Sequence, residues 1–181
     1  EDVRAACGGK TATVEKGERK ERAELPPKLY DLTTLQREAN RLYGFTAQQT
    51  LDYTQSLYEK KLVTYPRTDS RYLTEDMAAG LPSLVEAVAG ALPFMAGLET
   101  TVNAGRVVDS AKVSDHHAII PTPSMPGADL AALPAGEKAV LSLIAARLLC
   151  AVGEKYVTAE TVAALSCGGH TFTAKGRTVT A

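Results

Sequence analysis

The sequence predicts an α+β chain that is mainly α-helical, with a helical middle between two strand-forming ends. Residues 136–152 place Val, Leu and Ile along a wide apolar stripe at helical spacing. Residues 156–167 and 171–180 are rich in Val and Thr and alternate in polarity, and two glycines at 168–169 separate them. That pattern is typical of a β-hairpin. Residues 11–23 alternate loosely and are strongly charged, which favours an extended segment at the other end.

The bulk composition is that of a globular protein with a core. The chain has 181 residues, of which 45% are hydrophobic and 23% charged, enough for one large domain or one domain and part of another. No apolar run approaches the roughly 20 residues that cross a bilayer, so we expect no membrane partner. Without a basic and apolar leader, the expected location is the cytoplasm.

The three cysteines, Cys7, Cys150 and Cys167, are far apart and form no C-x-x-C pair. A zinc knuckle or a redox motif therefore has no local ligands. We expect reduced, structural thiols, as in a protein of the cell interior.

The charge balance gives no sign of a stand-alone DNA-binding domain. Twenty Lys and Arg residues stand against 21 Asp and Glu residues, so the formal net charge is −1, whereas such domains are usually basic. Any affinity for DNA must come from a local patch or from parts of the protein outside this chain. The chain begins at Glu1 without Met and ends at Ala181 inside the expected hairpin, so we expect a piece of a longer protein.

The first quarter of the chain is read as a boundary followed by a helix. Residues 11–23 are expected to be extended and solvated, with a flexible charged leader as the alternative, and the prolines at 26–27 mark a boundary. Thr33 or Thr34 can cap the first helix, and Gly44 can end it in a left-handed turn. Its expected apolar face is Leu35, Ala39 and Leu42.

A second helix follows at once, capped by Thr46. Its expected shared face is Leu51, Thr54, Leu57 and Tyr58. Because only residues 44–46 join the two helices, they must pack as a tight pair, as in a helix-turn-helix. Many helical proteins contain such a pair without binding DNA.

The rest of the middle alternates between short elements and loops. Residues 62–65 are β-prone and are halted by a proline, and Thr74 with two acids after it starts another helix. Residues 81–97 are expected to be a helix with breaks, and residues 98–135 to be mostly loop, with a notable cluster at 115–122.

The chemistry is concentrated around Tyr65. Pro66 restricts both itself and the tyrosine before it, and Arg67 would point to the same side as Tyr65 in an extended backbone. A guanidinium there could hold a phosphate while the phenol attacks it. A phenol with a pKa of about 10 needs a cation or a base to lose its proton. From the residues alone, a packed or solvated Tyr–Arg pair is the alternative.

Four blocks of sequence carry a resemblance to a known family. They are LYDLTTLQREAN at 29–40, GF at 44–45, SLYEKKLVTYPRTDSRYL at 56–73 and DHHAIIPT at 115–122. In this order and spacing they resemble the type IA DNA topoisomerases, specifically the topoisomerase III branch. The ending FTAKG at 172–176 is similar to a family segment that returns to the DNA-gate arch.

The resemblance implies a reaction. The tyrosine at the position of Tyr65 attacks a phosphodiester of single-stranded DNA, forms a 5′-phosphotyrosine and releases a 3′-hydroxyl. Another strand passes through the gap, and the hydroxyl then reverses the attack without ATP. Arg67 falls on the arginine that positions the scissile phosphate. His116 falls on a histidine that contacts DNA phosphate, where partial protonation near neutrality makes physical sense.

The resemblance also implies supporting positions. Further DNA contacts are expected from Gln55, Thr68 and Ser70. Supporting roles are expected for Glu59, Thr64 and Asp69. Asp69 could orient Arg67 or cap the turn after it, and His117 is interpreted as a loop residue covering the buried isoleucines that follow.

The family's fold and its metal site set the limits of this chain. The resemblance implies a helical tyrosine domain, related to winged-helix (CAP-like) proteins, at 29–150, inserted in a β-rich arch whose partial lengths are 1–28 and 151–181. The family's Mg²⁺ ligands lie in an N-terminal Toprim domain, and no D-x-D pair occurs here. We therefore expect no metal site in this chain and no relaxation of supercoiled DNA by it alone. The expected partners are single-stranded DNA, in the bacterial nucleoid, and the rest of the same polypeptide, as a monomer.

Other classes of DNA-cleaving enzyme lack support in this sequence. Tyrosine recombinases and type IB enzymes need a His-x-x-Arg cluster, which is absent. Rolling-circle nucleases need two histidines around a hydrophobic residue, whereas His116 and His117 are adjacent. The serious alternative is a non-catalytic winged-helix module that binds nucleic acid or protein, and the least specific one is a purely structural helical domain.

Overall fold

The computed structural model describes residues 2–97 and 100–180, which form two compact units. The first, here called the strand unit, combines residues 1–25 with residues 155–181, and the second, the helical unit, is residues 26–154. No helix within the described residues has the length and apolar character needed to cross a membrane.

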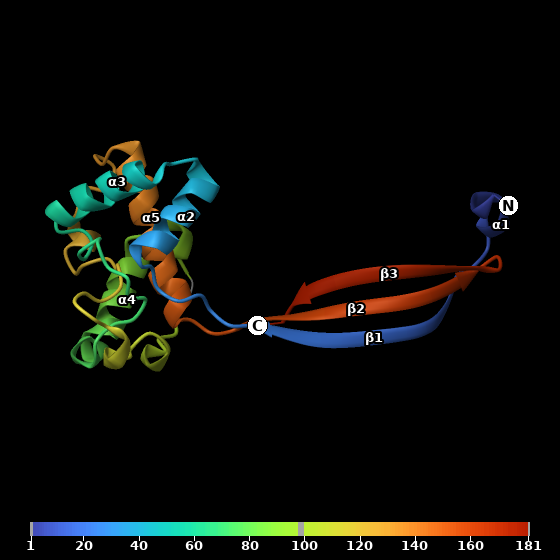
Figure 1. Ribbon diagram of the computed structural model, residues 1–181. Coiled ribbons are helices and arrows are strands. Elements are labelled where there is room, and N and C mark those ends of the chain that lie inside the picture. The colour runs from blue at the N-terminus through green and yellow to red at the C-terminus, as the bar shows by residue number, and fades with distance from the viewer. Residues whose placement is uncertain (1, 98–99, 181) are drawn as a thin grey trace. The chain divides into compact units, whose positions relative to one another are not determined.

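The strand unit is a three-stranded antiparallel sheet with β2 in the middle (Figure 1). Its elements are α1 (Val3–Cys7), β1 (Thr13–Glu24), β2 (Tyr156–Cys167) and β3 (His170–Val179). The turn between β2 and β3 is Gly168-Gly169, with φ of 56° and 83°. Two successive left-handed residues match the right-handed twist of a tight hairpin, so the predicted hairpin is confirmed.

Strand β1 decides between the two readings of the charged N-terminal segment. It pairs with β2 over its whole length, for example Arg19 with Thr161, with an irregularity between Val14 and Lys16. Every β1 side chain is exposed, which explains why the segment resembles a solvated leader. The segment is extended, as predicted, and the flexible-leader alternative is wrong because its backbone groups are paired in the sheet.

The helical unit is built around α5, with α2, α3 and α4 packed against it (Figure 1). Its α-helices are α2 (Leu32–Tyr43), α3 (Ala47–Glu59), α4 (Leu81–Gly90) and α5 (Ala135–Val152). Its 3₁₀ turns are η1 (Glu75–Gly80), η2 (Pro93–Met95), η3 (Ala104–Arg106), η4 (Ser110–Lys112) and η5 (Met125–Gly127). The helix start predicted at Thr74 is thus a short 3₁₀ helix of six residues that leads into α4.

Helix α2 begins two or three residues earlier than the sequence suggested, since its cap is Asp31 and not Thr33 or Thr34. Its cap is Asp31, whose carboxylate accepts the backbone N–H of Thr34 at 2.6 Å, so a cap at Thr33 or Thr34 is wrong. Gly44 ends the helix with φ of 71°, as predicted. Leu42 is 47% exposed and does not join the buried face.

Helix α3 starts with a full capping box, in which Thr46 and Gln49 bond each other's backbone N–H. The cap is therefore confirmed. The buried face is Thr50, Thr54 and Leu57, which differs from the expected face because the helix packs through its threonine side. The helix ends at Glu59 with Lys60 as its C-cap, and Lys61 follows with φ of 60°, although it is not a glycine.

The β-prone run at 62–65 does not form a regular strand. Within the described part of the helical unit, β-pairing consists of three isolated bridges, Tyr30 with Ile119, Val63 with Pro121 and Leu73 with Val108. The helix pair predicted for α2 and α3 is present, while the relation to winged-helix proteins stays a prediction.

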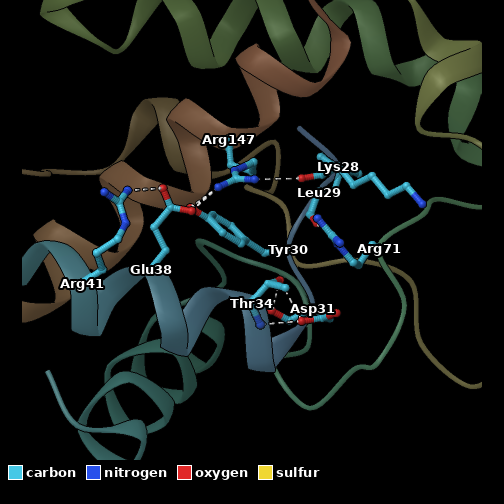
Figure 2. A network of polar contacts seen from close by, with 9 residues as sticks. All are labelled: Lys28, Leu29, Tyr30, Asp31, Thr34, Glu38, Arg41, Arg71 and Arg147. Carbon is cyan, nitrogen blue, oxygen red and sulfur yellow. Dashed lines mark hydrogen bonds and ion pairs between the residues drawn. The ribbon is translucent and has the colours of Figure 1, made fainter. Parts of the chain in front are cut away.

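A polar network fixes the segment that leads into α2 (Figure 2). The guanidinium of Arg147 lies 4.2 Å from the ring centre of Tyr30, bonds its hydroxyl at 3.1 Å and pairs with Glu38 of α2. Tyr30 is 1% exposed, and this burial, with Glu38 beside it, raises the pKa of its hydroxyl well above the ordinary value. The backbone N–H of Leu32 then bonds the carbonyl of Thr68 at 3.1 Å, so the network also holds the loop after Tyr65.

Candidate active site

The backbone before Tyr65 is fixed by Thr64. The Thr64 N–H bonds the Ile120 carbonyl at 3.0 Å, and its hydroxyl donates to the Ala118 carbonyl at 3.1 Å while accepting the Ile120 N–H at 3.0 Å. These three bonds join residues more than fifty positions apart. They place Tyr65 on the buried segment 118–120, which supports the positioning role expected for Thr64.

The Tyr65 ring is half-buried between two aromatic neighbours. The edge-to-face partner is Tyr58 of α3, with ring centroids 5.4 Å apart and an interplanar angle of 79°. The other is His116, 4.3 Å away and tilted by 44°. The phenol is therefore held from a helix and from a loop, and an imidazole that can carry a proton lies against it.

Arg67 is exposed and held by α3. Its guanidinium donates to the side-chain oxygen of Gln55 at 3.1 Å, and the Gln55 amide donates to Glu59 at 3.0 Å. Gln55 and Tyr58 are three residues apart, so they lie on one face of the helix. The structure thus brings Tyr65 and Arg67 against the same helical face, with Gln55 and Glu59 as the supports of the arginine.

Two nearly buried hydroxyls tie the loop after Arg67 to the histidine loop. Thr68, 7% exposed, donates to the His116 carbonyl at 2.7 Å and accepts the Ser70 N–H at 3.0 Å. Ser70, 4% exposed, donates to the Lys112 carbonyl at 2.8 Å. Both hydroxyls have protein partners, Thr68 at His116 and Ser70 at Lys112, and their direct contact with DNA stays a prediction.

The remaining predicted positions take particular partners. The Asp69 carboxylate accepts the hydroxyl of Ser114 at 3.1 Å, whereas Arg67 bonds Gln55. Asp69 therefore joins two loops in this structure. His117 is half-buried, and its Nδ1 lies 2.9 Å from the Ala118 carbonyl, a local contact that agrees with the interpretation of His117 as a loop residue.

Two hollows adjoin the tyrosine. One, of about 510 Å³, is lined by Asp31, Leu32, Thr33, Arg67, Thr68, Asp69, Ser114, Asp115 and His116. The other, of about 520 Å³, is lined by Tyr58, Glu59, Lys61, Val63, Thr64, Tyr65 and Thr122. Tyr65 lines the second hollow and His116 the first, and their rings are in contact. A phosphate in the first hollow would find a guanidinium and an imidazole there.

Sequence reasoning missed several of these residues. Tyr58, Ser114 and Asp115 line the site or contact its members. The sequence could have pointed to Tyr58, because only the end of α3 and a short turn separate it from Tyr65. Ser114 carried none, because only the folded loops place it beside Asp69.

The expectation of no metal site in this chain stays a prediction. Among residues 2–97 and 100–180, no three His, Cys, Asp or Glu side chains gather as ligands of a metal ion. The cysteines that the structure describes are free thiols.

Comparisons with known proteins add an independent line of evidence. A family model described as DNA topoisomerase matches residues 1–181. DNA topoisomerase 3 of Bacillus licheniformis is 42% identical over 180 residues, covering 96% of this chain and 24% of that protein. DNA topoisomerase 3 of Bacillus subtilis is 41% identical over 177 residues, covering 94% and 24%. The chain therefore spans about a quarter of the length of these relatives.

A solved structure is similar as well. The full-length topoisomerase I of Thermotoga maritima matches with a TM-score of 0.64 at 26% sequence identity. The match covers 93% of this chain and 27% of that chain. The similarity thus extends over both the strand unit and the helical unit.

Proposed function

Since this chain belongs to the type IA DNA topoisomerases, in their topoisomerase III branch, we propose that it carries the DNA-cleaving tyrosine of such an enzyme. The observation that supports this proposal is the placement of Tyr65, which contacts His116 while Arg67 is held by the same helix face. A nucleophile, a cation for phosphate and an imidazole thus come together from two segments, the stretch with Tyr65 and Arg67 and the loop with His116.

The proposed reaction is a reversible transesterification. The Tyr65 oxygen attacks the phosphorus of a phosphodiester in single-stranded DNA, and its phenolic proton passes to a base or to water. The bond from phosphorus to the 3′-oxygen breaks, and that oxygen leaves as a 3′-hydroxyl. The tyrosyl ester at the 5′-phosphate conserves the energy of the broken bond, so the hydroxyl reseals the strand without ATP after another strand has passed.

The neighbouring groups act on charge and orientation. Arg67 donates two parallel hydrogen bonds to the phosphate oxygens and stabilises the charge that develops on phosphorus. Its bond to Gln55 restricts the guanidinium before DNA arrives, which lowers the entropic cost of positioning. His116, protonated, adds a second cation beside the phenol.

The metal requirement belongs to the longer polypeptide in this proposal. The carboxylates described here do not make a ligand set, so the Mg²⁺ ligands are proposed to lie in a Toprim domain outside this chain. No step above is assigned to the metal. The proposal further takes the strand unit as part of the arch and the helical unit as a winged-helix-like insertion, in a monomer that acts on single-stranded DNA.

The decisive test is covalent capture of DNA by the full-length enzyme. The unaltered enzyme and the Tyr65→Phe variant are mixed with a 5′-labelled and a 3′-labelled oligonucleotide, denatured and separated by electrophoresis. The enzyme is expected to retain the label of the 3′-labelled strand alone, since the ester forms at the 5′-phosphate. Tyr65→Phe should retain none while still binding the strand.

The matched control is Tyr58→Phe, which removes a hydroxyl from the neighbouring ring and keeps the edge-to-face contact. It should form the adduct. An adduct in Tyr65→Phe would assign the nucleophile to another residue. Binding without any adduct in the unaltered enzyme would favour the non-catalytic winged-helix module.

A further inference from the structure

A second group of cations lies beside the tyrosine loop. The ammonium nitrogens of Lys28 and Lys112 lie 4.9 Å and 4.7 Å from the ring centre of Tyr72. Arg71 directly precedes Tyr72 in the chain, and its Nε donates to the Leu29 carbonyl at 3.1 Å. Figure 2 shows Lys28, Leu29 and Arg71 close together. Lys28, Arg71, Tyr72 and Lys112 are here called the lysine–tyrosine cluster.

The cluster carries a surplus of positive charge. Lys112 pairs with Asp109, while no ion pair of Lys28 or Arg71 occurs among the described residues. Three cations against one carboxylate leave a local charge of about +2 at neutral pH. The ammonium of Lys28 at the phenol, with Lys112 adding, lowers the pKa of Tyr72 below its ordinary value. A depressed phenol pKa is the expected effect of a positive potential.

The hollow beside Tyr65 has the opposite balance. Its lining holds one arginine and one histidine against Asp31, Asp69 and Asp115. With His116 neutral the net charge is −2, and with it protonated −1. This hollow can orient a phosphate through directed hydrogen bonds, but it cannot attract a polyanion by net charge.

The hollow and the lysine–tyrosine cluster are linked by the same two segments, the loop after Arg67 and the loop that holds Lys112 and His116. Thr68 bonds the backbone at His116, and Ser70 bonds the backbone at Lys112. From Arg67 to Tyr72 there are five residues, which span at most about 18 Å when fully extended. A single DNA strand of a few nucleotides can therefore reach from one place to the other.

We propose that the lysine–tyrosine cluster is a binding site for the phosphate backbone of the single-stranded DNA whose scissile phosphate lies at Tyr65. It supplies the salt-dependent attraction that the acidic hollow lacks. Arg67 and His116 set the position of one phosphate, and Lys28 with Lys112 neutralises its neighbours along the strand. The two lysines approach the same ring, so Tyr72 acts as the support that keeps both ammonium groups at this surface. This proposal rests on the proposed function.

The test is a titration of a fluorescent oligo(dT) with the 181-residue chain, followed by anisotropy over a series of salt concentrations. The altered protein is Lys28→Gln with Lys112→Gln. If each lysine neutralises one phosphate, the slope of log K against log salt falls by about 1.4, at about 0.7 per phosphate. If the two proteins bind equally at about 1 M salt, this difference in slope makes the altered protein bind about 60-fold more weakly than the unaltered chain at about 50 mM salt.

The matched control is Lys16→Gln with Lys20→Gln, two exposed lysines of β1 that flank Glu18. It changes the net charge equally and should weaken binding less than about 2-fold. Lys28→Arg with Lys112→Arg should keep the slope, because the charges remain. Circular dichroism and the thermal midpoint verify that each variant is folded.

The outcomes separate this proposal from the previous one. If the unaltered chain binds and the Lys28 and Lys112 variant binds equally well with the same slope, the cluster is not a DNA site, while the role of Tyr65 stands. The cluster is also not a DNA site if the β1 control loses as much affinity, since net charge alone then explains the loss. If the unaltered chain does not bind oligo(dT) at all at low salt, the cluster proposal is refuted, while the role of Tyr65 is decided separately by the adduct assay of the full-length enzyme.

Discussion

Replacing Thr68 by Val tests whether one buried hydroxyl holds the histidine loop in place. Valine has nearly the shape of threonine, so the change removes the hydroxyl without leaving a cavity. Two contacts disappear, the bond to the His116 carbonyl at 2.7 Å and the bond from the Ser70 N–H at 3.0 Å. The groups left behind decide the size of the effect.

The two groups differ in their access to water. Ser70 is 4% exposed, so its N–H cannot find a water partner and bears the full cost of an unsatisfied donor. His116 is exposed, so its carbonyl regains a bond to solvent. One unsatisfied buried group costs about 1–3 kcal/mol, which gives an expected loss of about 2 kcal/mol. For a chain of this size that lowers the thermal midpoint by about 4–8 °C.

The assay is unfolding in urea followed by circular dichroism, with Thr68→Ser as the control that keeps the hydroxyl. Serine loses only a methyl group, so its loss should stay near about 0.8 kcal/mol. In the full-length enzyme, Thr68→Val should also slow the formation of the tyrosyl adduct more than Thr68→Ser does, because His116 loses its tie. A valine variant as stable as the serine variant would refute the reasoning that the hydroxyl holds the two loops together.

Two further predictions concern stability. Lys61→Gly should raise the free energy of unfolding by about 0.5–1 kcal/mol, because Lys61 has φ of 60° just after α3 and glycine adopts that conformation without strain. The control is Lys61→Ala, which should show no gain in the same urea titration. Tyr30 has a raised pKa in the folded chain because it is buried, so its contribution is fully present below the unfolded pKa of about 10 and is lost as the pH rises above it. Between about pH 10 and 11 the unaltered chain should therefore lose up to about 1.4 kcal/mol more than Tyr30→Phe does, and equal slopes of the two proteins against pH would contradict the shift.

Local signals in the sequence predicted the elements that local chemistry determines. Gly44, Thr46 and the glycines at 168–169 each adopt the conformation or cap expected of their residue type. The failure at the start of α2 is also local: Asp31 and Thr34 are both good capping residues, and the buried Tyr30 before them selects Asp31 as the cap. Propensity ranks such candidates, but packing chooses between them.

Contacts between distant residues were beyond the reach of the pattern. Strand β1 reads as a solvated leader because no β1 side chain is buried, and only its partner at residues 156–166 makes it a strand. The same limit applies to the site. The sequence placed Tyr65 and Arg67 together through their spacing, but the contact of Tyr65 with His116 and the two lysines around Tyr72 arise from loops some forty to fifty residues apart.

The geometry at Tyr65 depends on the core of the helical unit through a continuous series of contacts. Arg147 in α5 fixes Tyr30, the backbone after Tyr30 bonds Thr68, and Thr68 bonds His116, which lies against the Tyr65 ring. Each step is a hydrogen bond or a ring contact, so a loss of packing at α5 should disturb the position of His116. Arg67, Lys28 and Lys112 are exposed, and these are the cations that meet phosphate in our proposals. Such a division is physically favourable, because the rigid series keeps the nucleophile oriented at little cost in entropy, while the charges that attract DNA stay hydrated until the strand arrives.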